Sequence, residues 1–467
     1  MIREMEYSPV AQDGRVPDRD AIIDGLARVR QRTLDIVSPL SDAGIRVQHS
    51  PIISPVIWDL GHIAEFEETW LVQRLGEASS VSALADAYDA MRTPRSARGD
   101  LDLPDRGATL DRLSRVRERA VARLRELDLA GSGNRLLEDG FVYELVREHE
   151  AQHQETVLQT IFLMESDPYA PVRRECPPDS ESVSAGQMIR VPAGEFEMGA
   201  AGGRFSYDNE RPCHIVATDE YEIGRYPVTN GEYLEFIAAG GYDERPVWSD
   251  EGWAWKEEVG LFAPQYWRLK ANPESTSSLA AAEGTRAAGE PAWERVTSLG
   301  SEPVRPTDPV IHVCHYEAEA FARFAGCRLP TEAEWEKAAA WDPDSGDCRR
   351  YPWGSDPSTR ERANLDLLAF GVAEVGAYPA GRSPVGCEQM LGDVWEWTSS
   401  RFAAYPGFEP YPYDDYSAVF FGQDYVVLRG SSWATDSGVA RNTFRNWDYP
   451  IRRQIFAGLR LARGVEA

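Results

Sequence analysis

The chain has 467 residues, 42% of them hydrophobic, so it is long enough for two or three domains with apolar cores. Its 76 acidic residues outnumber 49 basic ones and leave a net charge of −27. This balance argues against nucleic acid or an anionic membrane as a partner, and no obligate protein partner is evident.

The N-terminal stretch is acidic and lacks an apolar core, so we expect no signal peptide. No apolar run approaches the length of about eighteen residues that a transmembrane helix needs. The six cysteines show no CxxC spacing and fit reduced thiols better than a disulfide framework. We therefore expect a cytoplasmic protein.

Four stretches near the N-terminus have the apolar periodicity of amphipathic helices. They are residues 17–38, 56–75, 109–129 and 141–162. A loop with proline and glycine separates the second stretch from the third, which has a strongly basic outer face. Four such helices with one long connection predict a four-helix bundle over residues 1–170.

The last of these stretches contains His149 and His153, four residues apart. Side chains four apart on a helix lie on one face, so both imidazoles point the same way, as a shared metal ion requires. His62 lies on the second predicted helix and would supply a third nitrogen. Imidazole suits iron, zinc, copper and nickel, so the residue types leave the metal open. An isolated pair at this spacing is more often structural.

Glu155 follows two residues after His153 but lies about 200° around the helix from it. We therefore expect Glu155 to support the site and not to be a metal ligand.

After a polar, proline-rich linker at residues 171–187, the amino-acid composition of the chain changes. Residues 188–467 are rich in glycine and tryptophan and predict an irregular α+β domain with short helices. The elements predicted in it are a strand at 188–200 and helices at 228–241 and 328–341, each helix opening on a Thr-x-x-Glu capping box. Residues 270–303, rich in small and polar residues, predict a surface insertion.

Several phrases of the second domain, in this order, resemble the sulfatase-modifying-factor domain, which has the C-type-lectin-like fold of the formylglycine-generating enzyme. They are MIRVPAGEFEMG, YEIGRYPVTNGEYLEF, RLPTEAEWEKAA, YPWGS, GDVWEWTSS, VLRGSSW and GLRLAR. In the first domain, WDLGHIAEFEETW and HEAQHQE resemble a DinB-type bundle with an HxxxHxE signature. The two domains in this order resemble the ergothioneine-biosynthesis sulfoxide synthases, also called hercynine oxygenases, over nearly the whole chain.

The resemblance implies a non-haem Fe(II) enzyme that consumes O₂. Such an enzyme joins the sulfur of a thiol to the imidazole of hercynine (Nα-trimethylhistidine) and oxidises that sulfur to a sulfoxide. By match to the family's motifs, His62, His149 and His153 would be the three iron ligands.

The same resemblance implies roles for residues around the iron. Gln152 stands where the family uses a glutamine near bound hercynine, and Asn446, Trp447 and Asp448 match a motif that contacts both substrates. Tyr413 matches a tyrosine that delivers a proton during oxygen activation. A quaternary ammonium is best held by an aromatic face, which Trp447 would provide.

Arg95 and Arg98 bear on the choice of thiol. Two arginines three apart would clamp a carboxylate, although such a pair is ordinarily solvated on a loop. In the resembled family an arginine pair here, with an aspartate where Asp448 stands, goes with γ-glutamylcysteine, whose α-amino group that aspartate would take. We therefore expect γ-glutamylcysteine and not free cysteine.

Other functions remain open on the residues alone. A selenosugar donor would keep the histidines and need no arginine pair. A DinB-type thiol transferase or zinc hydrolase would leave the second domain without a role, and a non-catalytic binding module would make the histidines structural. A copper-dependent formylglycine-generating enzyme needs a cysteine pair, which the matching stretch RGSSWATDSGVARNTFRNW lacks.

Overall fold

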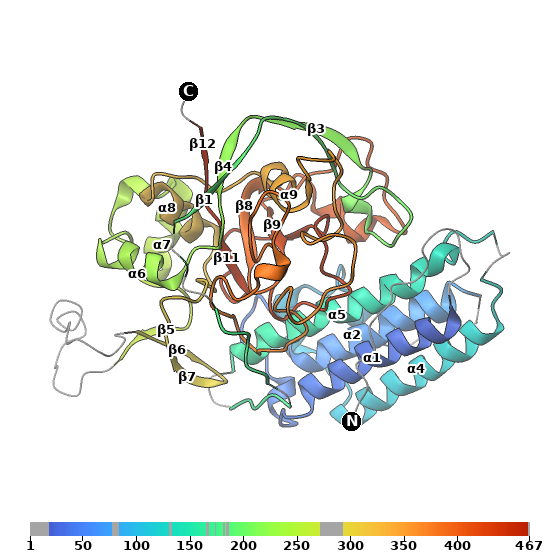
Figure 1. Cartoon of the computed structure of the whole chain (residues 1–467). Coiled ribbons are helices and arrows are strands. Elements are labelled where there is room, and N and C mark those ends of the chain that lie inside the picture. The colour runs from blue at the N-terminus through green and yellow to red at the C-terminus, as the bar shows by residue number, and fades with distance from the viewer. Residues whose placement is uncertain are drawn as a thin grey trace.

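The computed structural model has a helical N-terminal part and an α+β C-terminal part, which lie against each other (Figure 1). This confirms the two-domain fold predicted from the sequence. The structure describes residues 18–76, 84–129, 133–164, 168–172, 174–180, 183, 186–270 and 293–465.

The N-terminal part is the predicted four-helix bundle, with its long helices side by side (Figure 1). These helices are α1 (Arg19–Val37), α2 (Val56–Glu67), α4 (Arg106–Glu126) and α5 (Phe141–Phe162). A short helix, α3 (Ala85–Tyr88), lies in the long connection. Helix α2 ends earlier than predicted, because the chain continues as a π-helical segment over Glu68–Gln73.

A buried layer of ion pairs joins all four helices. Arg30 of α1 donates to Glu67 of α2 at 2.6 Å and to Glu150 of α5 at 2.8 Å. Arg117 of α4 pairs with the same two carboxylates. The prediction that the basic residues of this helix form an outer face is therefore wrong for Arg117, which points inward. Removing one member of such a group leaves an uncompensated buried charge, so the layer specifies how the helices pack.

The C-terminal part is built from small sheets and short helices. A mixed sheet with the order β10-β9-β8-β11 lies at its centre, and β11 runs parallel to β8. Its strands are β8 (Trp395–Arg401), β9 (Val426–Gly430), β10 (Asn446–Asp448) and β11 (Ala457–Leu459). The other sheets are β1 (Met188–Val191) with β4 (Tyr221–Gly224) and β12 (Ala462–Gly464), β2 (Gly194–Met198) with β3 (His214–Thr218), and β5 (Trp267–Leu269) with β6 (Trp293–Thr297) and β7 (Gly300–Pro303).

The helices of this part are α6 (Asn230–Ala238), α7 (Asp250–Val259), α8 (His315–Phe324) and α9 (Glu332–Ala340). Helices α6 and α9 open on the two predicted capping boxes, in which threonine and glutamate each bind the other's backbone. The strand predicted at 188–200 is in fact two strands, β1 and β2. The last residues of the predicted insertion form β6 and β7, and 271–292 lie outside the described residues.

Helix α5 lies at the boundary between the two parts (Figure 1). At its C-terminal end, Phe162 packs against Trp433 and Phe456 of the C-terminal part. One apolar cluster runs from the bundle into the C-terminal part without interruption. Helix α5, which carries His149 and His153, is therefore packed against both parts.

Within the described ranges, no helix has the length and apolar character needed to span a membrane. All six cysteines are free thiols, as expected from their spacing.

Candidate metal centre

The three predicted histidines meet between α2 and α5. One nitrogen from each of His62, His149 and His153 lies within 4.8 Å of the others. Nε2 of His62 is 3.2 Å from Nε2 of His149. The four-residue spacing on α5 brings His149 and His153 to one face, and the packing of α2 against α5 brings His62 opposite them.

Hydrogen bonds to neighbouring groups determine which ring nitrogen of His62 and of His153 faces the centre. Nδ1 of His62 donates to the carbonyl oxygen of Tyr88 at 2.7 Å, and Nδ1 of His153 donates to Oδ1 of Asp59 at 2.9 Å. A proton on Nδ1 leaves the Nε2 lone pair available, so these bonds select the tautomer that binds a metal.

Aromatic side chains stack on the faces of two of the three histidine rings. Phe66 stacks on His149 with ring centroids 3.6 Å apart and planes 7° from parallel. Trp58 stacks on His62 at 4.9 Å. The rings therefore have little freedom to turn away from the common point, and the site is organised before any ligand binds.

Burial favours the neutral form of two of these imidazoles, those of His62 and His149. Burial lowers the pKa of His62 well below its usual range, and the proximity of His153 adds to this effect. Burial and the two neighbouring histidines likewise lower the pKa of His149. Neutral imidazole is the form that binds metal ions, so a cluster of three imidazole nitrogens fits a divalent transition metal such as iron.

Asp59 is a testable part of this arrangement, because it is 1% exposed and its carboxylate binds His153. We expect Asp59→Asn to weaken binding of a divalent transition metal by about 10–100-fold, because a neutral amide makes His153 a poorer ligand. Anaerobic competition with a chelator measures the affinity. Asp86→Asn, at an exposed ion pair with Arg92, is the matched control. Equal affinity for the wild type and Asp59→Asn would contradict this role.

The structure brings Tyr413 next to the histidines. Its ring lies 6.4 Å from Phe66, which covers His149, and 5.1 Å from Trp70. Of the neighbouring tyrosines, Tyr411 packs on Phe141 at the start of α5. Tyr413 is thus a tyrosine that meets the bundle beside the metal centre.

Gln152 and the predicted substrate motif meet through a second tyrosine. Nε2 of Gln152 donates to the hydroxyl of Tyr207 at 2.7 Å. Tyr207 stacks on Tyr416 at 4.2 Å, and Tyr416 meets Trp447 edge-on at 5.9 Å. Trp447 belongs to β10, the edge strand that also carries Asn446 and Asp448. The histidines, Gln152, Tyr413 and Trp447 therefore share one aromatic region between the two parts.

The two predicted donor-binding arginines differ in environment. Arg98 is 6% exposed, donates to Ser54 and to the Thr93 carbonyl, and lies 3.4 Å above the Trp58 ring. Arg95 is exposed. Arg98 thus lies on the ring of Trp58, which in turn stacks on His62. Arg95 lies at the surface.

Asp448, the third residue predicted to bind the donor, accepts from Arg452 at 3.1 Å. Arg452 in turn donates to the carbonyl oxygen of Ile52, in the segment before α2. Asp448 therefore lies where β10 approaches the bundle.

Glu155 supports α5, as predicted. It does so by accepting hydrogen bonds from the C-terminal part. Its carboxylate accepts from the indole of Trp395 at 2.7 Å and from the hydroxyls of Ser432 and Thr435 at 3.0 and 2.9 Å. All three donors lie in the C-terminal part, so Glu155 fixes the ligand-bearing helix to it.

Several residues of the site escaped the sequence analysis. Asp59 lies three residues before His62, so helical spacing alone would have placed it on the same side of α2. Phe66 is four residues after His62, by the same rule. Tyr207 belongs to an irregular segment far from either histidine, and no local pattern points to it.

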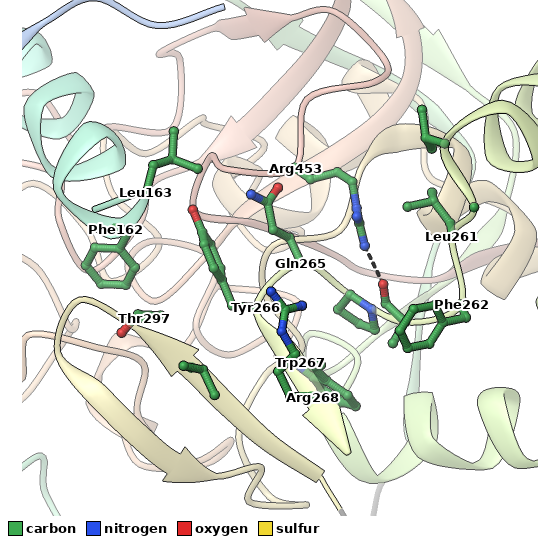
Figure 2. A pocket seen from close by; sticks show the side chains of 15 residues that line it. Phe162, Leu163, Leu261, Phe262, Gln265, Tyr266, Trp267, Arg268, Thr297 and Arg453 are labelled. Atoms are coloured by element: carbon green, nitrogen blue, oxygen red, sulfur yellow. Dashed lines mark hydrogen bonds between the residues drawn. The ribbon is translucent and has the colours of Figure 1, made fainter. Parts of the chain in front are cut away.

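Two cavities of the described structure lie away from these histidines. One of about 530 Å³ is found beside the C-terminal end of α5, where Phe162, Tyr266 and Arg453 line it (Figure 2). Phe162 is nine residues beyond His153, which is about 14 Å along a helix. A second cavity, of about 460 Å³, is lined by Glu144 and other residues of the first half of α5 and by facing loops. None of the predicted site residues lines either cavity.

Comparison with known proteins matches both parts of the chain to protein families. Residues 26–157 match the DinB superfamily, and residues 173–465 match the sulfatase-modifying factor enzyme 1-like domain.

Full-length relatives contain both parts. A hercynine oxygenase of Mycolicibacterium smegmatis is 45% identical over 460 residues, which cover 96% of this chain and 99% of the relative. A hercynine oxygenase of Mycobacterium tuberculosis is 44% identical and covers 94% of this chain and 97% of its own length. A formylglycine-generating enzyme of Thermomonospora curvata is 33% identical but covers 46% of this chain and 72% of its own length. Of these three relatives, the two hercynine oxygenases are therefore similar to both parts of this chain.

Proposed function

This chain belongs to the hercynine oxygenase family, and we propose that it is a sulfoxide synthase of ergothioneine biosynthesis. It joins the sulfur of γ-glutamylcysteine to C2 of the hercynine imidazole and oxidises that sulfur to a sulfoxide. One C–H and one S–H bond break, a C–S and an S=O bond form, and O₂ is reduced to the sulfoxide oxygen and one water. The observation that carries this proposal is the cluster of three imidazoles beside Tyr413 and Gln152.

His62, His149 and His153 would hold the metal, and we propose that it is Fe(II). Iron(II) held by three nitrogens would supply a site for O₂ and the thiolate and would pass electrons from the two substrates to O₂. The protein contributes the orientation of the rings through Tyr88, Asp59 and Phe66.

A binding site for hercynine needs an aromatic face for the trimethylammonium cation and a hydrogen-bonding partner for the imidazole. We assign the trimethylammonium group to the aromatic region around Trp447 and Tyr416, because a quaternary ammonium cannot form ordinary hydrogen bonds. We assign the imidazole to Gln152, which lies on the same helix as two metal ligands. Asn446, the neighbour of Trp447 on β10, would complete this side. Holding C2 beside the sulfur is what makes bond formation fast.

For the thiol donor we propose that Arg95 and Arg98 bind carboxylate and that Asp448 binds the α-amino group of γ-glutamylcysteine. Arg98 reaches the metal centre through Trp58 and His62, and Asp448 lies where β10 meets the segment before α2. The pair would position the sulfur next to His62.

Tyr413 would hold the proton that reduced oxygen needs, and its replacement is a test. We expect Tyr413→Phe to slow sulfoxide formation by about 10²-fold, because a general acid contributes that much, and to shift the product toward oxidation of the thiol alone. Mass spectrometry of the products measures the ratio. Tyr411→Phe, which packs on Phe141 instead, is the control. An unchanged product ratio in Tyr413→Phe would assign the role to another group.

The direct test of the proposed function is O₂ uptake by the protein after anaerobic reconstitution with Fe(II). We expect uptake only when hercynine and a thiol are both present, with γ-glutamylcysteine preferred over cysteine. A selenosugar donor is the third arm of the experiment. No uptake with any donor would overturn the proposal. The free cysteines support a reducing compartment such as the cytoplasm as its location.

A further inference from the structure

One face of α5 is bound to the C-terminal part at three successive turns. Glu148, Gln152 and Glu155 are spaced i, i+4 and i+7, so they lie along one side of the helix. Each binds a different group across the boundary, as described above for Gln152 and Glu155. The ligands His149 and His153 project from the adjacent face. The C-terminal part therefore holds the helix that carries these ligands.

Glu148 connects this face to the segment that carries Tyr207. Arg441 is fully buried and donates to Glu148 at 2.9 Å and to Glu210 at 2.6 Å. Oε1 of Glu210 accepts from the backbone N–H of Tyr207 at 2.8 Å. The position of Tyr207 relative to α5 is thus set by a chain of charge-assisted hydrogen bonds, which are stronger than bonds between neutral groups.

The ring of Tyr207 is held as firmly as its backbone. It is 2% exposed and packs between Tyr416, in parallel at 4.2 Å, and Phe205, edge-on at 5.1 Å. Its hydroxyl therefore occupies one position, 2.7 Å from Nε2 of Gln152. A glutamine amide otherwise rotates easily about its last torsion, whose preferences are broad.

We propose that Tyr207 is a positioning residue for the imidazole substrate, acting through Gln152. With the amide nitrogen bound to Tyr207, the amide oxygen remains as an acceptor for an N–H of the imidazole. The C-terminal part, through Tyr207 and through Tyr416, which also hydrogen-bonds Gln152, thereby determines how a residue of α5 meets its substrate. This inference rests on the proposed function, because it needs hercynine as the ligand of Gln152.

Tyr207→Phe tests the inference, because it keeps the stacked ring and removes only the hydroxyl. In the Fe(II)-loaded full-length protein we expect KM for hercynine to rise about tenfold, equivalent to about 1.4 kcal/mol. We expect kcat to change less than about twofold, as for the loss of an interaction made equally in the ground and transition states. KM for γ-glutamylcysteine and the iron content should not change.

A double-mutant cycle separates this role from a merely structural one. Gln152→Met keeps a side chain of similar length without donor or acceptor, and it should raise KM for hercynine as Tyr207→Phe does. The double variant should be no worse than Gln152→Met, because the second change removes a group that acts only through the first. Tyr233→Phe is the control, since this buried hydroxyl bonds Tyr242 within the C-terminal part.

Two results would overturn the inference while the proposed function stands. One is a wild-type KM for hercynine in Tyr207→Phe, and the other is additive effects in the double variant. A wild-type protein that consumes no O₂ with any donor would instead overturn the proposed function, and the role of Tyr207 with it.

Discussion

Replacing His149 with alanine is expected to abolish iron binding and turnover together. The substitution removes one of three nitrogens that lie within 4.8 Å of one another. Loss of an outer partner of a metal ligand costs about 10–100-fold, so loss of the ligand itself should cost more than about 100-fold. Elemental analysis after anaerobic reconstitution measures iron content, and O₂ uptake with hercynine and γ-glutamylcysteine measures turnover.

His214→Ala is the matched control for this experiment. His214 lies on β3 beside Tyr405, and its ring binds the carbonyl oxygen of Pro212. It should keep wild-type iron content and turnover. If His149→Ala instead kept both, the histidine cluster would be structural and the chain would be better described as a binding module. Loss of iron with unchanged melting temperature separates a lost ligand from a lost fold.

The spacing of the histidines and the bounds of their helix follow from local patterns. Apolar periodicity predicts a helix over residues 141–162, and α5 has these bounds. The four-residue spacing predicts that His149 and His153 share a face, because helical geometry allows no other arrangement. His62 comes from a helix whose packing no local pattern specifies, and the resemblance of the flanking residues to a known family supplied its role.

The groups that orient the site are less predictable. Phe66 and Asp59 follow from helical spacing once His62 is accepted as a ligand. Tyr207 does not, because it reaches Gln152 from an irregular segment 55 residues away in the chain. Its position depends on Glu210 and Arg441, and pattern-based analysis treats charged residues as exposed. The exposure of Arg95 and the burial of Arg98, three residues apart in a loop, likewise depend on tertiary packing.

Buried arginines are a general feature of the C-terminal part. Arg429, Arg441, Arg445 and Arg460 are each at most 2% exposed, and each binds a buried carboxylate. Arg441 differs from the other three because one of its partners, Glu148, belongs to the bundle. Loss of Arg441 should therefore affect both the stability of the fold and the site.

Arg441→Met should lower the free energy of unfolding by about 3–5 kcal/mol, because it leaves buried Glu210 without its cation and Glu148 with only the more distant Arg147, at 3.7 Å. Burial already raises the pKa of Glu148 to about 7 although Arg441 opposes the shift. Urea denaturation followed by fluorescence measures the loss. Arg190→Met removes an ion pair with Glu220 whose arginine side chain is 60% exposed, and it should leave the free energy of unfolding nearly unchanged, because solvent screens this pair.

A triple variant tests whether the destabilisation comes from the buried carboxylate charges. Glu148→Gln and Glu210→Gln, added to Arg441→Met, remove both carboxylates, so much of the lost stability should return. The backbone N–H of Tyr207 can still donate to the amide oxygen that Glu210→Gln introduces, but the link to α5 through Arg441 cannot form. We therefore expect a protein that is folded yet binds hercynine more weakly than the wild type. Full recovery of both properties would show that the ion pair contributes nothing to the site.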